Sequence, residues 1–269
     1  MSIPVVIRGG GDLASGVALR LHRAGIGLAI LELEKPMAVR RTVSFAEAIY
    51  SGSIEIEGVI GRHAEKMEDC ERIAYEGEIP VLIDPKGEYL KAQGPKAVVD
   101  ARMTKRTPVN GFGGRQILIG LGPGFVAGEN CDAVVETIRG HNLGRVLWQG
   151  SAQVDTGVPG TIASYNLDRV LRAPADGNVN AKVAIGDKLA GGDVVAIIGE
   201  TELRTRFDGV LRGLVHPALR VHKGMKIGDI DPRNDPSYCW RVSDKALAIG
   251  GGVLEALLTR PEVRHQLLP

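Results

Sequence analysis

The sequence predicts an α/β protein that combines a Rossmann-like parallel sheet domain, a small β barrel-sandwich domain of the biotinyl/lipoyl type and a C-terminal helix. Two short aliphatic strands, Val5–Ile7 and Ile117–Ile119, each run into a glycine-rich loop. From Arg172 onward the pattern changes to short strands and glycine turns, and Val242–Leu258 returns to helical spacing. We expect domains at 1–155 and 156–235, followed by a helical segment at 236–269 that packs on the first domain.

The first elements form a βαβ unit. After the strand, Leu13, Val17 and Leu21 recur every four residues and predict an amphipathic helix over 12–24, and Leu28–Leu31 is the next strand. Gly9, Gly11 and Ala14 match the G-x-G-x-x-G/A spacing of dinucleotide-binding loops, and Glu32 stands where an acid binds the ribose. The predicted cofactor-binding residues here are Arg8, Gly9, Gly10, Gly11, Asp12, Ala14 and Glu32.

Two features of this unit leave an alternative open. Asp12 places a negative charge where a phosphate would bind, and it is also suited to cap the helix. The unit could therefore keep the nucleotide-binding fold and bind no nucleotide. Arg40 and Arg41 follow the second strand and suit a 2′-phosphate or another phosphorylated group, or else lie in a solvated turn.

Further candidates follow later strands. Asp100 and Arg102 come after the strand 97–99, which places them at the rim of the glycine loops or pairs them in an internal ion pair. The second glycine loop supplies Gly120, Gly122 and Gly124. The segment 131–138 is predicted as a helix with Glu136 and Arg139 toward solvent, and 144–148, which begins with Gly144-Arg145, as a strand. Glu136, Arg139 and Arg145 are added to the predicted binding residues.

His141 is the best catalytic candidate. It lies in the glycine turn between these two elements and could act as a base or as a phosphate ligand, or simply form a hydrogen bond. The catalytic residue otherwise stays unknown, and so does whether the chain is an enzyme.

The sequence of the second domain contains an internal repeat. The segment 173–179 resembles 205–211, and each holds an Asp-Gly pair, as expected of two halves of a barrel-sandwich. The hairpin at 199–205 has no lysine, so a swinging-arm carrier is excluded. Asp229 and Asp231 lack the glycine of a calcium loop, and we interpret them as turn caps.

The amino-acid composition limits the classes of partner that we expect the chain to bind. The 33 Lys and Arg residues almost balance 32 Asp and Glu, which excludes a general attraction to nucleic acid or membrane surfaces. No apolar run approaches the roughly 20 residues of a membrane span, and we expect a cytoplasmic protein. The three cysteines are widely separated and predict neither disulfides nor a tightly bound metal. A homodimer is the general prior for soluble proteins.

Several blocks together resemble one family, the accessory proteins of selenium-dependent molybdenum hydroxylases (YqeB type). The blocks are Arg8–Gly16, Arg40-Arg41, Asp100–Arg102, Gly120–Phe125, Glu136–His141, Gly144-Arg145, Thr156–Gly160 and Lys226–Arg233. The resemblance implies a Rossmann-like domain similar to that of the xanthine dehydrogenase maturation factors, fused to a barrel-sandwich module. It also implies a molybdenum hydroxylase, or its maturation machinery, as the partner.

Two hypotheses about function follow. In the first, the chain is a maturation factor that binds a nucleotide or a molybdopterin-type cofactor, a small phosphorylated ligand held by the glycine loops and arginines. In the second, it is an NAD(P)-dependent oxidoreductase that acts on a small substrate with His141 as proton donor. We favour the first because no dehydrogenase-type catalytic pair is present in the sequence.

Overall fold

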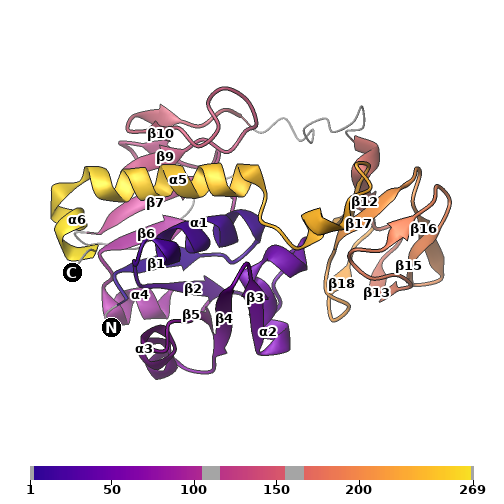
Figure 1. The fold of residues 1–269 in the computed structure, drawn as a ribbon, viewed down its shortest axis with the longest axis horizontal. Coiled ribbons are helices and arrows are strands. Elements are labelled where there is room, and N and C mark those ends of the chain that lie inside the picture. The colour runs from indigo at the N-terminus through magenta and orange to yellow at the C-terminus, as the bar shows by residue number, and fades with distance from the viewer. Residues whose placement is uncertain (1–2, 105–115, 155–166, 268–269) are drawn as a thin grey trace. The chain divides into compact units, whose positions relative to one another are not determined.

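A computed structural model describes residues 3–104, 116–154 and 167–267 (Figure 1). The expected boundary at 155/156 and the block Thr156–Gly160 lie outside these residues. The chain divides into two compact units, and each is described by itself. The first comprises Met1–Pro36, Ser44–Thr156 and Val242–Pro269, and the second Met37–Val43 and Gly157–Arg241.

The first unit is built on a nine-stranded sheet in the order β10-β9-β7-β6-β1-β2-β5-β4-β3. In that order the strands are Val146–Leu147, Ala133–Val135, Ile117–Leu121, Ala97–Asp100, Val5–Arg8, Leu28–Glu32, Ile79–Ile83, Val59–Ala64 and Ser53–Ile56. The pairs from β9 through β4 are parallel. The two outermost pairs, β10–β9 and β4–β3, are antiparallel. A two-stranded ladder joins β8 (Val126–Ala127) to β11 (Gly150–Ser151).

The predicted Rossmann-like parallel sheet is therefore wrong, because hairpins make both edges of this sheet antiparallel. At one edge Glu57 and Gly58 both adopt positive φ, 49° and 83°, which turns the chain back as a two-residue hairpin requires. At the other edge, the segment 131–138 forms strand β9 in place of the predicted helix. Its consecutive Val134 and Val135 are fully buried, as suits β-branched residues in a sheet.

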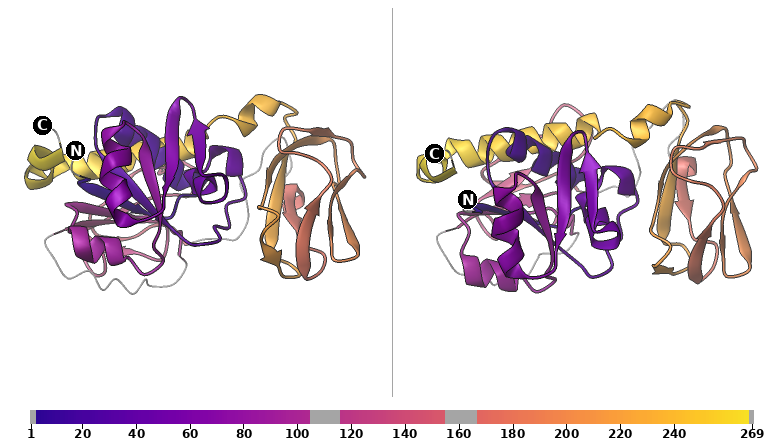
Figure 2. Two further views of the ribbon diagram at one scale, coloured as in Figure 1. Left: turned by 90° about the horizontal axis from the view of Figure 1, so that it is seen from below. Right: turned by 60° about the horizontal axis from the view of Figure 1, so that its bottom comes forward.

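Helices cover both faces of the sheet (Figures 1 and 2). The helices are α1 (Asp12–Arg23), α2 (Ala48–Ser51), α3 (Met67–Tyr75), α4 (Glu88–Gln93), α5 (Asp244–Thr259) and α6 (Pro261–Leu267), with a 3₁₀ turn η2 at Phe45–Glu47. Residues of α3 and α4 share one buried cluster with Val6 and Ala29 of the sheet. Helix α5 packs on α1 and on β7, β9 and β10. Within the described part of the chain, no helix has the length and apolar character needed to cross a membrane.

Glycines let α1 and α5 approach closely. A Cβ on Gly16 would stand 2.6 Å from the backbone of Ala246, and one on Gly250 would stand 2.6 Å from the carbonyl oxygen of Gly16. The Arg20 Nε–H of α1 donates to the carbonyl oxygen of Leu247 on α5. The small-residue face that the sequence shows on the first helix is thus the face that receives the last long helix.

The second unit consists of two four-stranded antiparallel sheets. One has the order β12-β19-β17-β14, with strands Val170–Arg172, Lys226–Asp231, Gly209–Leu214 and Lys188–Leu189. The other has the order β16-β15-β13-β18, with strands Thr201–Arg204, Val194–Ile198, Gly177–Ala181 and Arg220–Val221. The 3₁₀ turns η1 (Arg41–Val43), η3 (Leu167–Arg169) and η4 (Pro236–Cys239) complete the unit, whose core is aliphatic.

The prediction of a biotinyl/lipoyl-type barrel-sandwich is wrong, and the unit is instead described as two four-stranded antiparallel sheets. The two Asp-Gly pairs that suggested an internal repeat precede β13 in one sheet and β17 in the other. The sequence similarity between the two segments therefore reflects two similar turns at strand starts. Such turns do not by themselves specify a barrel-sandwich topology. Asp229 is also corrected, because it is buried within strand β19 and bound by Arg40. Asp231, the last residue of β19, does accept the Arg233 N–H at 3.1 Å, as a turn cap would.

Candidate functional site

Charged residues gather at one edge of the large sheet. Strands β1, β2, β6 and β9 end at or just before Arg8, Glu32, Asp100 and Glu136, and Asp84 follows β5. Because these strands are parallel, all five residues lie at the carboxyl edge, where ligands of open α/β sheets bind. Backbone N–H groups donate hydrogen bonds to three of the four acids, Glu32, Asp84 and Glu136. Arginine side chains bind the fourth, Asp100.

Protein groups fill the first glycine loop. The Gly10 N–H donates to Glu32 Oε1 at 2.6 Å, and the Gly10 carbonyl oxygen accepts from the Ala46 N–H at 2.9 Å. A Cβ on Gly10 would stand 2.9 Å from the Ala46 nitrogen, so the loop packs against η2. Glu32 thus binds an amide that a pyrophosphate would otherwise use. Burial raises the pKa of Glu32, although hydrogen bonds from Gly10 and Leu33 oppose the shift.

Other predicted residues of this loop have local roles. Gly11 is the N-cap of α1, Asp12 lies in its first turn and Ala14 is buried in the helix. Gly9 adopts a φ of +93°, and a Cβ there would stand 3.4 Å from the backbone of Ala101.

Asp100 is the centre of an internal ion pair, which is one of the two alternatives that the sequence left open. Arg102 binds it with Nε at 2.9 Å and Nη2 at 2.5 Å, and Arg8 approaches to 3.8 Å. Asp100 is fully buried and Arg8 nearly so. Burial, followed by the positive charge of Arg102, lowers the pKa of Arg8.

The second glycine loop serves packing. A Cβ on Gly120 would overlap the buried ring of Phe125. Gly122 has a φ of +86° and lies beside Met103 and Thr137, and Gly124 is buried.

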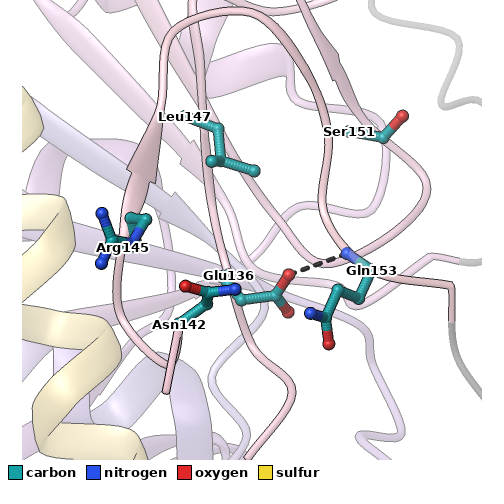
Figure 3. Close-up of a pocket in the computed structure, with 6 residues that line it drawn as sticks. All are labelled: Glu136, Asn142, Arg145, Leu147, Ser151 and Gln153. Atoms are coloured by element: carbon teal, nitrogen blue, oxygen red, sulfur yellow. Dashed lines mark hydrogen bonds between the residues drawn. The ribbon is translucent and has the colours of Figure 1, made fainter. Parts of the chain in front are cut away.

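A pocket of about 410 Å³ lies at the β9–β10 hairpin (Figure 3). Its lining consists of Glu136, Asn142, Arg145, Leu147, Ser151 and Gln153. Glu136 is 2% exposed, and its Oε1 and Oε2 accept the N–H groups of Ile138 and Gln153, each at 2.7 Å. These bonds tie β9 to the chain that follows β11. Of the lining residues, the sequence predicted Glu136 and Arg145.

The remaining predicted residues lie elsewhere. His141 is exposed in the turn of the hairpin and is not among the six lining residues. Arg139 forms a two-pronged ion pair with Asp244 at the start of α5, at 2.6 and 2.7 Å. Arg40 and Arg41 belong to the second unit, where Arg40 binds Asp229 and Arg41 donates to the Leu214 carbonyl oxygen.

Sequence reasoning missed Asn142, Leu147, Ser151, Gln153 and Asp84. Asp84 had a usable signal, because it directly follows an aliphatic strand, as Asp100 does. Ser151 and Gln153 had none, because the antiparallel pairing of β11 with β8 brings their segment to the pocket.

The cysteines are not activated thiols. Burial raises the pKa of Cys70 to about 12 and that of Cys131 to about 11, and it also raises the pKa of Cys239. All three thiols therefore stay protonated at neutral pH. In the described ranges no group of three or more His, Cys, Asp or Glu side chains is arranged to hold a metal ion.

Fold and site together define a mixed α/β protein with a small polar pocket at the carboxyl edge of its large sheet. No protein family matches the chain by its sequence profile. The chain is 48% identical over 254 residues to the Escherichia coli K12 protein named "Uncharacterized protein YqeB". The alignment covers 94% of this chain and 47% of that protein. The chain thus spans about half the length of the curated relative it matches.

Likenesses to solved structures are weak. One is an aspartoacylase family protein from Mesorhizobium loti, with 11% identity and a TM-score of 0.27 over 86% of this chain and 85% of that one. Another is a succinylglutamate desuccinylase/aspartoacylase from Rhodobacter sphaeroides, with 13% identity and a TM-score of 0.26 over 85% of each chain. TM-scores this low carry no argument about the fold or the activity of this chain.

These comparisons correct the identification drawn from the resemblance. The relative's name assigns it no part in molybdenum hydroxylase maturation. The predicted maturation function, its molybdenum and selenium chemistry, and the NAD(P)-dependent oxidoreductase alternative are therefore withdrawn.

Proposed function

We propose that the first unit binds a small organic anion, through a carboxylate group of the ligand, in the pocket of the β9–β10 hairpin. The observation that carries the proposal is Arg145. Arg145 lines the pocket, and among the residues that the structure describes its side chain forms no hydrogen bond or ion pair, whereas its backbone pairs with Asn142 and Glu136. A guanidinium with this freedom can bind a carboxylate through two parallel N–H bonds.

The charge of the pocket favours a monoanionic group. Glu136 carries the one negative charge of the lining, and two backbone N–H groups already satisfy its oxygens. Arg145 carries the one positive charge, so the empty lining is neutral overall. A carboxylate on Arg145 adds one negative charge, whereas a phosphate dianion adds two beside the buried Glu136.

The size and the other lining residues fit a metabolite-sized ligand. A cavity of about 410 Å³ falls within the roughly 300–1,000 Å³ typical of small-molecule sites. Asn142, Ser151 and Gln153 offer hydroxyl and amide groups that donate and accept hydrogen bonds, and Leu147 offers an apolar contact. Such a lining suits a polar ligand body with a short carbon chain.

A binding panel tests this proposal. The wild-type chain and Arg145→Gln would be titrated by calorimetry with acetate, malate, inorganic phosphate and ADP. We expect a carboxylate to bind the wild type and to bind Arg145→Gln at least about tenfold more weakly, since a charge-assisted hydrogen bond contributes roughly 1.5–3 kcal/mol. ADP also tests the prediction of a nucleotide cofactor, which stays open along with the molybdopterin-type cofactor and the homodimer.

Arg72→Gln is the matched control. Arg72 is an exposed arginine of α3 whose partner is Glu76, one turn away. Both arginine variants should unfold within about 0.5 kcal/mol of the wild type, as surface substitutions usually do. The proposal fails if no carboxylate binds, or if a folded Arg145→Gln chain binds it as tightly as Arg72→Gln does.

A further inference from the structure

Helix α5 is anchored to the β9–β10 hairpin, which carries most of the pocket residues. The helix packs on β9 and β10, and it is drawn in faint yellow beside Arg145 in Figure 3. In its first turn, Asp244 pairs with Arg139 at 2.6 and 2.7 Å. Just after its last turn, the guanidinium of Arg260 lies 5.1 Å from the centroid of the Trp148 ring. The hairpin is therefore held at both ends of α5.

The tightest contact lies in the middle of α5, at the turn that precedes Arg145. Gly144 in this turn has a φ of +79°, and a Cβ on it would stand 2.6 Å from the Ala248 carbonyl oxygen. One helical turn further along α5, a Cβ on Gly252 would overlap the Gly144 carbonyl oxygen and stand 2.9 Å from Val135 Cγ1. Neither glycine can therefore gain a side chain unless the hairpin or the helix moves.

This contact is one peptide bond away from the pocket. The Gly144 carbonyl group belongs to the same peptide unit as the N–H of Arg145, and that N–H donates to the Asn142 carbonyl oxygen at 3.0 Å. The Arg145 carbonyl oxygen accepts the Glu136 N–H at 3.0 Å, and the Glu136 side chain binds the N–H of Gln153. A displacement of the Gly144 carbonyl group therefore reaches four of the six residues that line the pocket.

We infer that α5 positions Arg145 for ligand binding and that Gly252 is the positioning residue through which it acts. The effect on affinity rests on the proposed function, because Arg145 is the residue proposed to bind the carboxylate. A guanidinium forms two parallel N–H bonds to a carboxylate only in a defined geometry. Protein interiors contain few voids and transmit displacements. A side chain at position 252 would therefore move Arg145 away from that geometry, although Gly252 does not itself line the pocket.

Three consecutive glycines of α5 provide matched variants. A Cβ on Gly252 meets the hairpin, whereas one on Gly250 would stand 2.6 Å from the Gly16 carbonyl oxygen of α1. A Cβ on Gly251 meets no described atom outside the helix within 4 Å. The three alanine variants thus add the same methyl group to the same helix and differ in what that group contacts.

The experiment applies three measurements to the full chain and to the three alanine variants. The first needs no ligand and follows the backbone amide resonances of Glu136, Arg145 and Gln153 in ¹H–¹⁵N correlation spectra. The second is calorimetric titration with acetate and malate. The third is urea unfolding, which reports the stability of each variant separately from its affinity.

Gly252→Ala should shift the three amide resonances and weaken carboxylate binding about tenfold, as the loss of one charge-assisted hydrogen bond would. Gly250→Ala should lower stability through the contact with α1 and leave the resonances and the affinity unchanged. Gly251→Ala should leave both unchanged and raise stability, because alanine is the better helix former. A merely structural role would make Gly252→Ala behave like Gly250→Ala.

The inference is overturned if Gly252→Ala leaves the three amide resonances where Gly251→Ala leaves them, or if it binds the carboxylate as tightly as Gly250→Ala does. If no carboxylate binds the wild type, the proposed function fails, and the amide resonances still decide whether α5 positions Arg145.

Arg139→Gln decides the outcome if Gly252→Ala does not fold. Its side chain is 43% exposed, and its fork on Asp244 is the anchor at the start of α5. The variant should shift the Glu136 amide resonance and weaken carboxylate binding relative to Arg72→Gln, which changes an exposed arginine of α3. An Arg139→Gln chain that matches Arg72→Gln in both measurements would overturn the inference.

Discussion

Three of the acids at the carboxyl edge of the large sheet and the two acids of β19 are stabilised by different partners. Glu32, Asp84 and Glu136 accept hydrogen bonds from backbone N–H groups. Asp229 and Asp231 accept them mainly from arginine side chains. Backbone donors satisfy a carboxylate without adding net charge, and they fix the loops that bind it. Arginine donors, by contrast, bring a positive charge to each carboxylate that they bind.

The largest expected effect is that of Asp229→Asn. The change removes the buried carboxylate that Arg40 binds at 2.6 Å and that Arg169 approaches at 4.0 Å. Breaking a buried ion pair from one side typically costs about 3–5 kcal/mol. Urea unfolding would measure the loss.

Asp168→Asn provides the comparison for that measurement. Asp168 pairs with Arg206 at 2.7 Å, but both side chains are exposed. Its loss should stay below about 1 kcal/mol. If the two variants lose similar amounts, the β19 aspartates contribute no more than a surface pair.

A smaller loss is expected for Asp84→Asn at the edge of the sheet. Asp84 Oδ1 accepts the Glu88 N–H at 2.9 Å, and Oδ2 accepts the Tyr89 N–H at 2.8 Å. Asparagine keeps one acceptor and turns an NH₂ group toward the other donor, which should cost about 1–3 kcal/mol. In Asp193→Asn, by contrast, the single bond from the Ala190 N–H can be kept, so unfolding should be almost unchanged. Equal losses would show that the second N–H bond of Asp84 contributes nothing.

The smallest effect, and the one that separates the two sets of acids most clearly, is their pH dependence. Burial raises the pKa of Glu32 above its ordinary value of 4.5, so its contribution to stability is present below that pH and is lost as pH rises. Burial alone would also raise the pKa values of Asp229 and Asp231, but Arg40 and Arg233 lower them below 3.8. Their contribution is present above pH 3.8 and is lost as pH falls below it.

Glu32→Gln and Asp229→Asn would be compared with the wild type by urea unfolding between pH 3 and 7. Relative to the wild type, the stability of Glu32→Gln should improve as pH rises above 4.5. The deficit of Asp229→Asn should shrink as pH falls below 3.8. Parallel curves for either variant would show that the acid it lacks titrates alike in the folded and unfolded chains.

Local elements could be predicted from the sequence, and their long-range pairing could not. The aliphatic runs of β1, β2 and β6 and the four-residue spacing of α1 were recognised because periodicity and burial agree there. Strand β9 was predicted as a helix because the short apolar run at 131–138 fits either period. The hairpin at Glu57 was missed because a positive φ at a residue other than glycine leaves no clear sequence signal.

The same limit applies to the sites. Glu136 and Arg145 were predicted as binding residues because they flank the glycine turn that contains His141, whereas Ser151 and Gln153 reach the pocket through a ladder with β8. Arg40 and Arg41 were predicted either to bind a phosphorylated group or to lie in a solvated turn. The structure instead places the segment 37–43 in the second unit, with Arg40 on Asp229, 189 residues later in the chain. Neither pairing leaves a periodic signal.

The contact between α1 and α5 also bears on biosynthesis. A ribosome that adds about 5–20 residues per second has completed α1 some 10–50 s before it completes α5, because Arg23 and Asp244 lie at opposite ends of the chain. During that interval the glycine face around Gly16 has no helix to cover it. The nascent chain therefore exposes this face of α1 to chaperones until the last long helix emerges.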